Sequence, residues 1–156
     1  MRSVVPQRPD RARLSLSVQY ATSEPGLPAR SRLRAFAQAA LERPAQVTLR
    51  LVDEAEGRRL NRDFRGKDYP TNVLTFVYDD ADPLSGDVVL CAPVVAAEAR
   101  SQHKELAAHY AHLVVHGVLH LQGYDHESDE EAAAMEARET EILGKLGYPD
   151  PYAVAS

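Results

Sequence analysis

The sequence has a single cysteine, Cys91, among its 156 residues. One cysteine cannot form an internal disulfide, and it also excludes a structural zinc site made of four thiolates. Long hydrophobic runs are missing too, since charged residues interrupt each run well before the roughly 20 residues that a transmembrane helix needs. Residues 1–10 include Arg2, Arg8 and Asp10 and lack an apolar segment, so we expect no secretory signal. These absences predict a cytoplasmic protein with no membrane partner.

The composition is that of an ordinary globular protein, with 44% hydrophobic and 26% charged residues. This balance excludes disordered and collagen-like chains. A chain of this length is typical of one domain with one core, so we expect residues 1–156 to form a single domain. Residues 1–13 are expected to be a basic arm and residues 148–156 a mobile tail.

The net charge of −5 conceals a strong segregation of charge along the chain. Residues 1–67 contain 14 basic and 7 acidic side chains, whereas residues 68–156 contain 4 basic and 16 acidic ones. An acidic average would argue against a nucleic-acid partner, but the average is a poor guide when charge is segregated. We therefore expect a basic cleft on one face and an acidic surface elsewhere.

Hydrophobic periodicity predicts strands and helices in the order βαβαββααα. The strands are expected at 14–20, 47–51, 73–77 and 87–91, and the helices at 31–41, 53–66, 93–102, 104–121 and 129–146. Expected helix N-caps are Ser31, Asp53 with Glu56, and Ser128 with Glu131. This order indicates an α+β fold, in which a small mixed four-stranded sheet is packed with about five helices.

Four histidines, His109, His112, His116 and His120, follow one another at spacings of three, four and four residues. They therefore share one face of the predicted helix 104–121. His116 and His120 are about 6 Å apart along the axis and can bind one ion together, and His112 and His116 have the same spacing. His112 and His120 are about 12 Å apart, too far to share that ion. A further ligand must select the pair.

The candidate for this further ligand is His126, which lies shortly after Gly123 in the sequence. A glycine can take the left-handed conformation that ends a helix and turns the chain back, which brings His126 towards His120. This favours the set His116, His120 and His126. Three histidines with a fourth position open are typical of a catalytic zinc site at the end of a central helix, with one Zn²⁺ per chain.

The spacing also equals that of the metzincin proteases, His-Glu-x-x-His-x-x-Gly-x-x-His, but Gly117 replaces the glutamate that acts as their general base. A protease of the usual kind is therefore not expected. Asp125 has two interpretations, a hydrogen-bond acceptor for a ligand imidazole or a turn residue. For His109 alone, a structural position on the helix face is the preferred interpretation.

Residues 57–67 contain five basic side chains and one acid. Such a run commonly forms a solvated helix face, which we expect for Arg58, Arg59 and Arg62. Arg65 and Lys67 differ, because they lie at a glycine-containing loop before a buried strand, where functional groups often gather. The guanidinium of Arg65 can bind a phosphate through two hydrogen bonds and stabilise charge in a phosphoryl transition state.

Three segments together resemble one known family. They are N-R-D-F-R-G-K-D-Y-P-T-N-V-L-T-F (61–76), G-D-V-V-L-C-A-P (86–93) and H-L-V-V-H-G-V-L-H-L-Q-G-Y-D-H (112–126). The sequence is similar in these segments to the YbeY endoribonucleases. The resemblance implies a zinc-dependent enzyme that cleaves single-stranded RNA, matures the 3′ end of small-subunit ribosomal RNA and acts in ribosome quality control.

By this resemblance, His116, His120 and His126 are the zinc ligands, and Arg65 and His116 are the catalytic residues. The implied partners are ribosomal RNA and ribosomal particles, with small-subunit ribosomal proteins as candidates. Two alternatives stay open. The first is a zinc hydrolase of another bond, such as an amide, and the second is a ribosome-assembly factor whose zinc braces the fold without catalysis.

Overall fold

The structure is a computed structural model that describes residues 13–153. Nearly all of the predicted basic arm, residues 1–13, and the last three residues of the predicted tail therefore lie outside the described residues. Within 148–153, the backbone N–H of Tyr148 donates to the carbonyl of Leu143 over 2.9 Å. This part of the predicted tail packs against the last helix.

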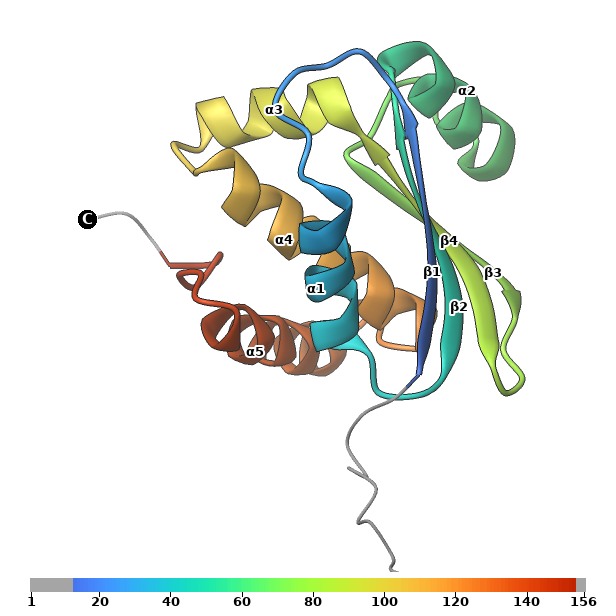
Figure 1. Cartoon of the computed structure of the whole chain (residues 1–156), viewed down its shortest axis with the longest axis vertical. Helices are drawn as coiled ribbons and strands as arrows, with labels where there is room; N and C mark the ends of the chain where they lie inside the picture. The colour runs from blue at the N-terminus through green and yellow to red at the C-terminus, as the bar shows by residue number, and fades with distance from the viewer. Residues whose placement is uncertain (1–12, 154–156) are drawn as a thin grey trace, which may run out of the picture.

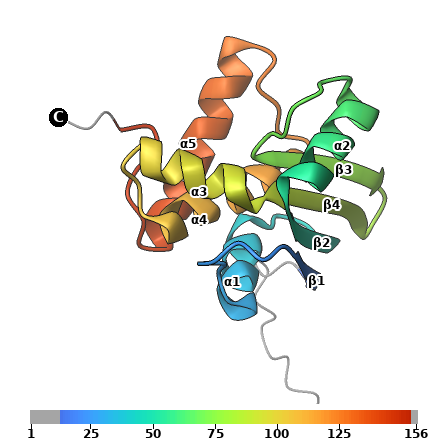
Figure 2. The ribbon, with the colours of Figure 1, turned by 90° about the horizontal axis from the view of Figure 1, so that it is seen from above.

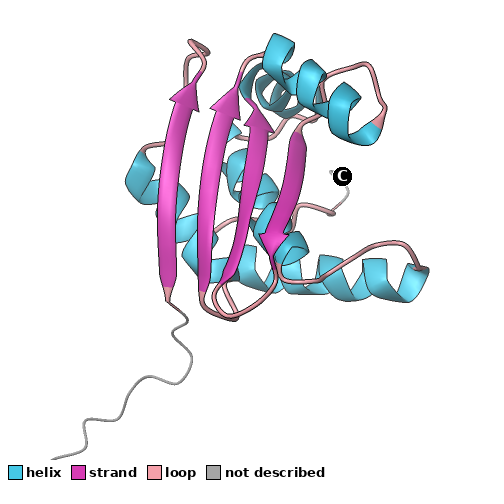
Figure 3. Cartoon of the chain, turned by 90° about the vertical axis from the view of Figure 1, so that its right-hand side faces the viewer, coloured by secondary structure: helices cyan, strands magenta, loops and turns pink. Residues whose placement is uncertain are grey.

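Four strands form one mixed sheet in the order β1-β2-β4-β3 (Figure 3). The strands are β1 (Leu14–Ala21), β2 (Ala45–Val52), β3 (Val73–Asp79) and β4 (Leu84–Cys91). β1, β2 and β4 run parallel, and β3 is antiparallel to β4. Val18, Leu49 and Val88 are in register across the three parallel strands, so their buried side chains form one apolar row.

Five helices complete the described fold: α1 (Arg30–Ala40), α2 (Glu54–Arg65), α3 (Ala92–Ser101), α4 (Leu106–Leu121) and α5 (Asp129–Lys145). α1, α4 and α5 lie on one face of the sheet, whereas α2 lies at its upper end (Figure 1). The predicted element order, sheet and number of helices are confirmed. None of the helices in residues 13–153 combines the length and the hydrophobicity needed to cross a bilayer.

α4 is the central helix, packed between the sheet and the helices α1, α3 and α5. Its sequence is apolar on most sides, as expected for a helix that is buried nearly all round. Tyr110, Val114 and Val118 are each no more than 1% exposed and form part of the main core. Because α4 is buried in the core, the histidines on this helix are held in fixed positions.

α2 covers a second, smaller core at the carboxyl ends of β2 and β4. This cluster contains Val52, Leu74, Val89 and Cys91. Gly57 permits the close approach, since a Cβ there would lie 3.1 Å from the sulfur of Cys91. Packing of α2 at this end of the sheet fixes the position of the loop that follows it.

Two of the three expected helix caps are wrong. α1 begins at Arg30, with Ala29 rather than Ser31 at the N-cap. Asp53 occupies the N-cap position of α2 but its carboxylate accepts a hydrogen bond from Thr22, and Glu56 forms an ion pair with Arg50. The expected capping box of α2 is therefore replaced by contacts with Thr22 and Arg50. The cap of α5 is confirmed, because the hydroxyl of Ser128 accepts from the backbone N–H of Glu131 over 3.1 Å.

Candidate metal centre

The three histidines His116, His120 and His126 meet at the C-terminal end of α4. One ring nitrogen from each lies within 4.8 Å of the other two. Gly123 has a φ of 102°, so it ends the helix in the left-handed conformation and the chain turns back. The turn brings the ring of His126 to a centroid distance of 4.9 Å from that of His120. The predicted residues therefore form one cluster.

The chemistry of this cluster fits a divalent transition metal, because imidazole nitrogens are good ligands for zinc. Burial lowers the pKa of His120, and the neighbouring His116 and His126 lower it further. The His120 ring is therefore neutral near pH 7 and keeps a lone pair for a metal. His116 and His120 are half-buried and His126 is exposed, so the cluster opens to solvent on one side.

Glu139 on α5 forms hydrogen bonds with two histidines of α4, His112 and His116. One carboxylate oxygen accepts a hydrogen bond from Nε2 of His112 and the other from Nδ1 of His116, each over 2.8 Å. The hydroxyl of Tyr152 donates to the same carboxylate. Since Nδ1 of His116 donates to Glu139, its Nε2 is left to bind a metal.

Glu139 is ionised in spite of its complete burial. Burial raises its pKa, but hydrogen bonds from His112, His116 and Tyr152 outweigh this effect and hold the pKa at about 2. Glu139 was not among the residues predicted from the sequence. The signal was present, because Met135, Glu139 and Ile142 share the buried face of α5, and an acid within an apolar stripe is unusual.

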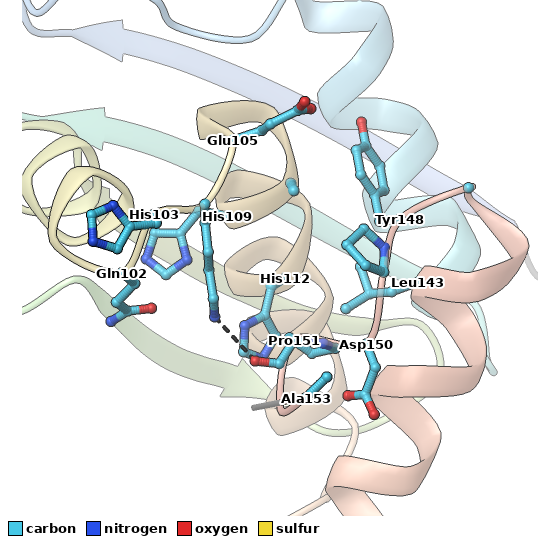
Figure 4. A pocket seen from close by; sticks show the side chains of 14 residues that line it. Gln102, His103, Glu105, His109, His112, Leu143, Tyr148, Asp150, Pro151 and Ala153 are labelled. Atoms are coloured by element: carbon cyan, nitrogen blue, oxygen red, sulfur yellow. Dashed lines mark hydrogen bonds between the residues drawn. The ribbon is translucent and has the colours of Figure 1, made fainter. Parts of the chain in front are cut away.

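The remaining histidines of α4 belong to another region. His109 is buried, and its Nε2 lies 2.9 Å from a carboxylate oxygen of Glu98. His109 and His112 line a cavity of about 590 Å³ between the turn after α3 and the segment after α5 (Figure 4). There the ammonium group of Lys104 donates to the carbonyl of Pro151 over 3.1 Å. His109 is thus separate from the cluster, whereas His112 lines this cavity and is also linked to His116 through Glu139.

A cavity of about 610 Å³ lies beside the cluster and has all three of its histidines in the wall. Other wall residues come from the end of α2, the loop after it and β3, and include Phe64, Arg65, Asn72, Thr75 and Phe76. The loop before β3 and the loop before α5 lie on the same side of the molecule (Figure 2). Tertiary packing thus places the arginine-rich segment beside the histidines.

Arg65 is the arginine of this segment that lines the cavity. Within residues 13–153, its guanidinium has no hydrogen-bond or ion-pair partner. By contrast, Arg58 binds Asp68 through two hydrogen bonds of 2.8 and 2.9 Å, and Arg62 lies 3.2 Å from Asp63. Arg65 is therefore available for an anionic ligand, whereas these two arginines are engaged with neighbouring carboxylates.

The loop before β3 is held from three sides. The side chain of Asn61 donates to the carbonyl of Tyr69 over 2.7 Å. The side chain of Asn72 donates to Glu98 over 3.0 Å, and the backbone carbonyl of Asn72 accepts from the backbone N–H of Cys91 over 2.9 Å. These contacts fix the cavity wall that contains Arg65 and Asn72.

Asp125 stabilises the turn that contains His126. Its carboxylate accepts a hydrogen bond from the backbone N–H of His126 over 2.7 Å. Its contact is therefore with the backbone of the turn and not with a ring nitrogen of the three histidines.

Gly117 faces the sheet rather than the cavity. A Cβ at this position would lie only 2.7 Å from Cγ1 of Val88 and 3.5 Å from Cγ2 of Thr75. α4 thus packs too closely on the sheet for a glutamate at this position. The close packing of α4 on the sheet therefore excludes the glutamate base of the metzincins at position 117.

The family model and the relatives that match this chain carry the same description. The family model for Endoribonuclease YbeY matches residues 28–147. The Endoribonuclease YbeY of Nitrosospira multiformis is 60% identical over 94% of this chain and 85% of its own length. That of Nitrosomonas europaea is 60% identical over 90% of this chain and 86% of its own length.

A solved structure shares the fold. The solution structure of TM1509 from Thermotoga maritima has a TM-score of 0.53 and 27% identity, and it covers 89% of this chain and 99% of its own. The family match extends over most of the chain and includes the histidine cluster, Arg65 and Glu139. This protein therefore belongs to the Endoribonuclease YbeY family.

Proposed function

We propose that this protein is a metal-dependent endoribonuclease that cleaves single-stranded RNA, with one Zn²⁺ per chain bound by His116, His120 and His126. The observation that carries the proposal is a single cavity that contains three convergent imidazoles and an arginine without a partner among residues 13–153. Metal-dependent phosphodiester cleavage uses a Lewis acid together with a cation that binds the phosphate, and this cavity offers groups for both. The relatives named Endoribonuclease YbeY support RNA as the substrate class.

A bound zinc ion would supply Lewis acidity to a phosphate oxygen and lower the pKa of water. Arg65 holds the scissile phosphate through its guanidinium and stabilises the negative charge that grows in the transition state. His116 has its Nδ1 engaged by Glu139, which orients the ring and leaves Nε2 to bind the metal. Arg65 and His116 are therefore the residues to which we assign catalysis.

We further infer the biological role from the family resemblance. It is maturation of the 3′ end of small-subunit ribosomal RNA and ribosome quality control, in the cytoplasm. Ribosomal particles are the expected partners, with small-subunit ribosomal proteins as candidates. Arg65 supports a phosphate-containing polyanion as the substrate, and the same cavity wall also contains Asp125 and Glu127.

The experiment uses protein purified without an affinity tag. Its metal content is measured, and single-stranded RNA, duplex RNA and an unstructured protein are each incubated with it. We expect cleavage of single-stranded RNA, loss of cleavage with a chelator and recovery when zinc is returned. Cleavage of the protein substrate instead would favour the alternative zinc hydrolase. Zinc binding without any cleavage, together with binding to ribosomal particles, would favour the non-catalytic assembly factor.

A further inference from the structure

Phe64 is an exposed aromatic residue at the mouth of the cavity. It lies in the last turn of α2 next to Arg65, and 67% of its surface is exposed. Apolar side chains stabilise a fold through the area that they remove from water, and Phe64 removes little. Its ring nevertheless lines the same cavity as the three histidines. Core packing therefore does not account for an aromatic residue here.

The ring of Phe64 is supported from the sheet side. Phe76 of β3 contacts it edge-to-face, with a centroid distance of 5.2 Å and an interplanar angle of 69°. Phe76 is itself half-buried and packs against the small core under α2. The support limits movement of the Phe64 ring while most of its surface stays open to a ligand.

Positive charge flanks this ring. Arg65 and Lys67 are both exposed, and neither side chain has a hydrogen-bond or ion-pair partner within residues 13–153. A single nucleic-acid strand presents flat bases that alternate with phosphates, so it needs an aromatic surface next to cations. The end of α2 offers both over a few residues.

We propose that Phe64 is a stacking platform for one nucleobase of single-stranded RNA, adjacent to the phosphate that lies at the histidine cluster. Arg65 and Lys67 contact the backbone phosphates on either side of that base. The platform rests on the proposed endoribonuclease function and adds a base-binding subsite to it. Because every base has a π face, it favours unpaired over paired RNA without strong sequence preference.

The chain contains no tryptophan, which permits a direct test of stacking. The variant Phe64→Trp places one fluorescent ring at the platform, where the exposure of the position tolerates the larger side chain. A short single-stranded RNA with 2′-O-methyl groups is titrated into it, and fluorescence is recorded. We expect saturable quenching that is lost with an abasic oligonucleotide of the same length. Binding itself is followed separately by the anisotropy of a labelled oligonucleotide.

The matched control is Tyr20→Trp, on β1 at the opposite edge of the sheet, where the native ring is also exposed. Its fluorescence should not change on RNA binding. If the oligonucleotide binds but leaves Phe64→Trp unquenched, the platform is wrong while RNA binding stands. If the wild-type chain binds no single-stranded RNA, the proposed function fails and the platform fails with it.

A second variant measures the effect on binding. Phe64→Ala should weaken binding of the intact oligonucleotide about ten-fold, as loss of one stacked base predicts. Its affinity for the abasic oligonucleotide should equal that of the wild type. Unchanged affinity of Phe64→Ala for intact RNA would overturn the proposal.

Discussion

The carboxylate of Glu139 accepts a hydrogen bond from Nδ1 of His116 over 2.8 Å, across 23 residues of sequence. The contact joins α5 to α4, and Glu139 is fully buried beneath it. A buried carboxylate of this kind selects the tautomer of a metal-binding histidine and holds its ring. The orientation of one expected metal ligand therefore depends on a helix that contributes no ligand itself.

The first prediction concerns Glu139→Gln, which keeps the size of the side chain and removes its charge. We expect zinc affinity to fall by roughly 10- to 100-fold, as for other residues that orient metal ligands. Competition with a chromophoric chelator measures this affinity. Glu130→Gln is the control, since it removes an exposed acid from the same helix and should leave the affinity unchanged. Equal zinc affinity in both variants would show that Glu139 does not orient the ligand.

Removal of a histidine from the cluster is the second prediction. His116→Ala should purify without zinc and show RNA cleavage at background level, because two imidazoles hold the ion poorly. Metal analysis and a cleavage assay on the same preparation check this. His103→Asn is the control, because His103 is exposed and its φ of 55° suits asparagine. A zinc-loaded, active His116→Ala enzyme would refute the assigned ligand set.

Arg65 gives the third prediction. Arg65→Ala should lower kcat/KM for single-stranded RNA about 100-fold or more, the effect of removing one group that stabilises the transition state. Zinc content should stay at the wild-type level, since the guanidinium is not a metal ligand. Arg62→Ala removes an arginine from the same helix that is paired with Asp63, and we expect little change. Cleavage by Arg65→Ala at the wild-type rate would contradict the role given to this residue.

Packing of α4 on the sheet gives the fourth prediction. Gly117→Ala should lower the free energy of unfolding by about 1–3 kcal/mol, because the added methyl group would meet Val88 at 2.7 Å. Gly144→Ala, in the last turns of α5, has no atom within 4 Å of the added group and should stabilise the protein by about 0.5–1 kcal/mol. Urea denaturation of both variants measures the difference. Equal stabilities would mean that the helix has room to move away from the sheet.

The fifth prediction is a pH dependence due to His109. Burial lowers its pKa, as do Lys104 and His112, while Glu98 raises it by a smaller amount. The unfolded chain therefore takes up the proton first as pH falls. The stabilising contribution of neutral His109 is complete above its ordinary pKa of about 6.5 and is lost as pH falls through the lower folded-state pKa.

His109→Gln keeps a side-chain donor for Glu98 but does not titrate. We therefore expect wild-type stability to decrease more than that of the variant between about pH 7 and pH 5. Urea denaturation at a series of pH values provides the comparison. Parallel stability curves for the two proteins would show that His109 has the same pKa in the folded and unfolded states.

The sequence alone predicted the elements and the cluster, because both depend on local spacing. Apolar periodicity gave the order of strands and helices, and one helical turn sets the distance between His116 and His120. Gly123 indicated the turn that brings His126 back towards the helix, since glycine readily takes the left-handed backbone conformation. The local N-caps at Ser31 and Asp53 were predicted wrongly. α1 already begins at Arg30, and the carboxylate of Asp53 accepts a hydrogen bond from the distant Thr22, which is not visible in a local pattern.

Tertiary structure alone decided which groups surround the cluster. Arg65 lies beside it because α2 packs at the end of the sheet, and Glu139 lies beneath it because α5 packs against α4. The overall charge of −5 gave no sign of this arrangement, since charge acts through distance in space and not through position in the chain. The sequence determined which residues could bind a metal. The packing determined which of them are oriented for it, and which cation and aromatic ring face the same cavity.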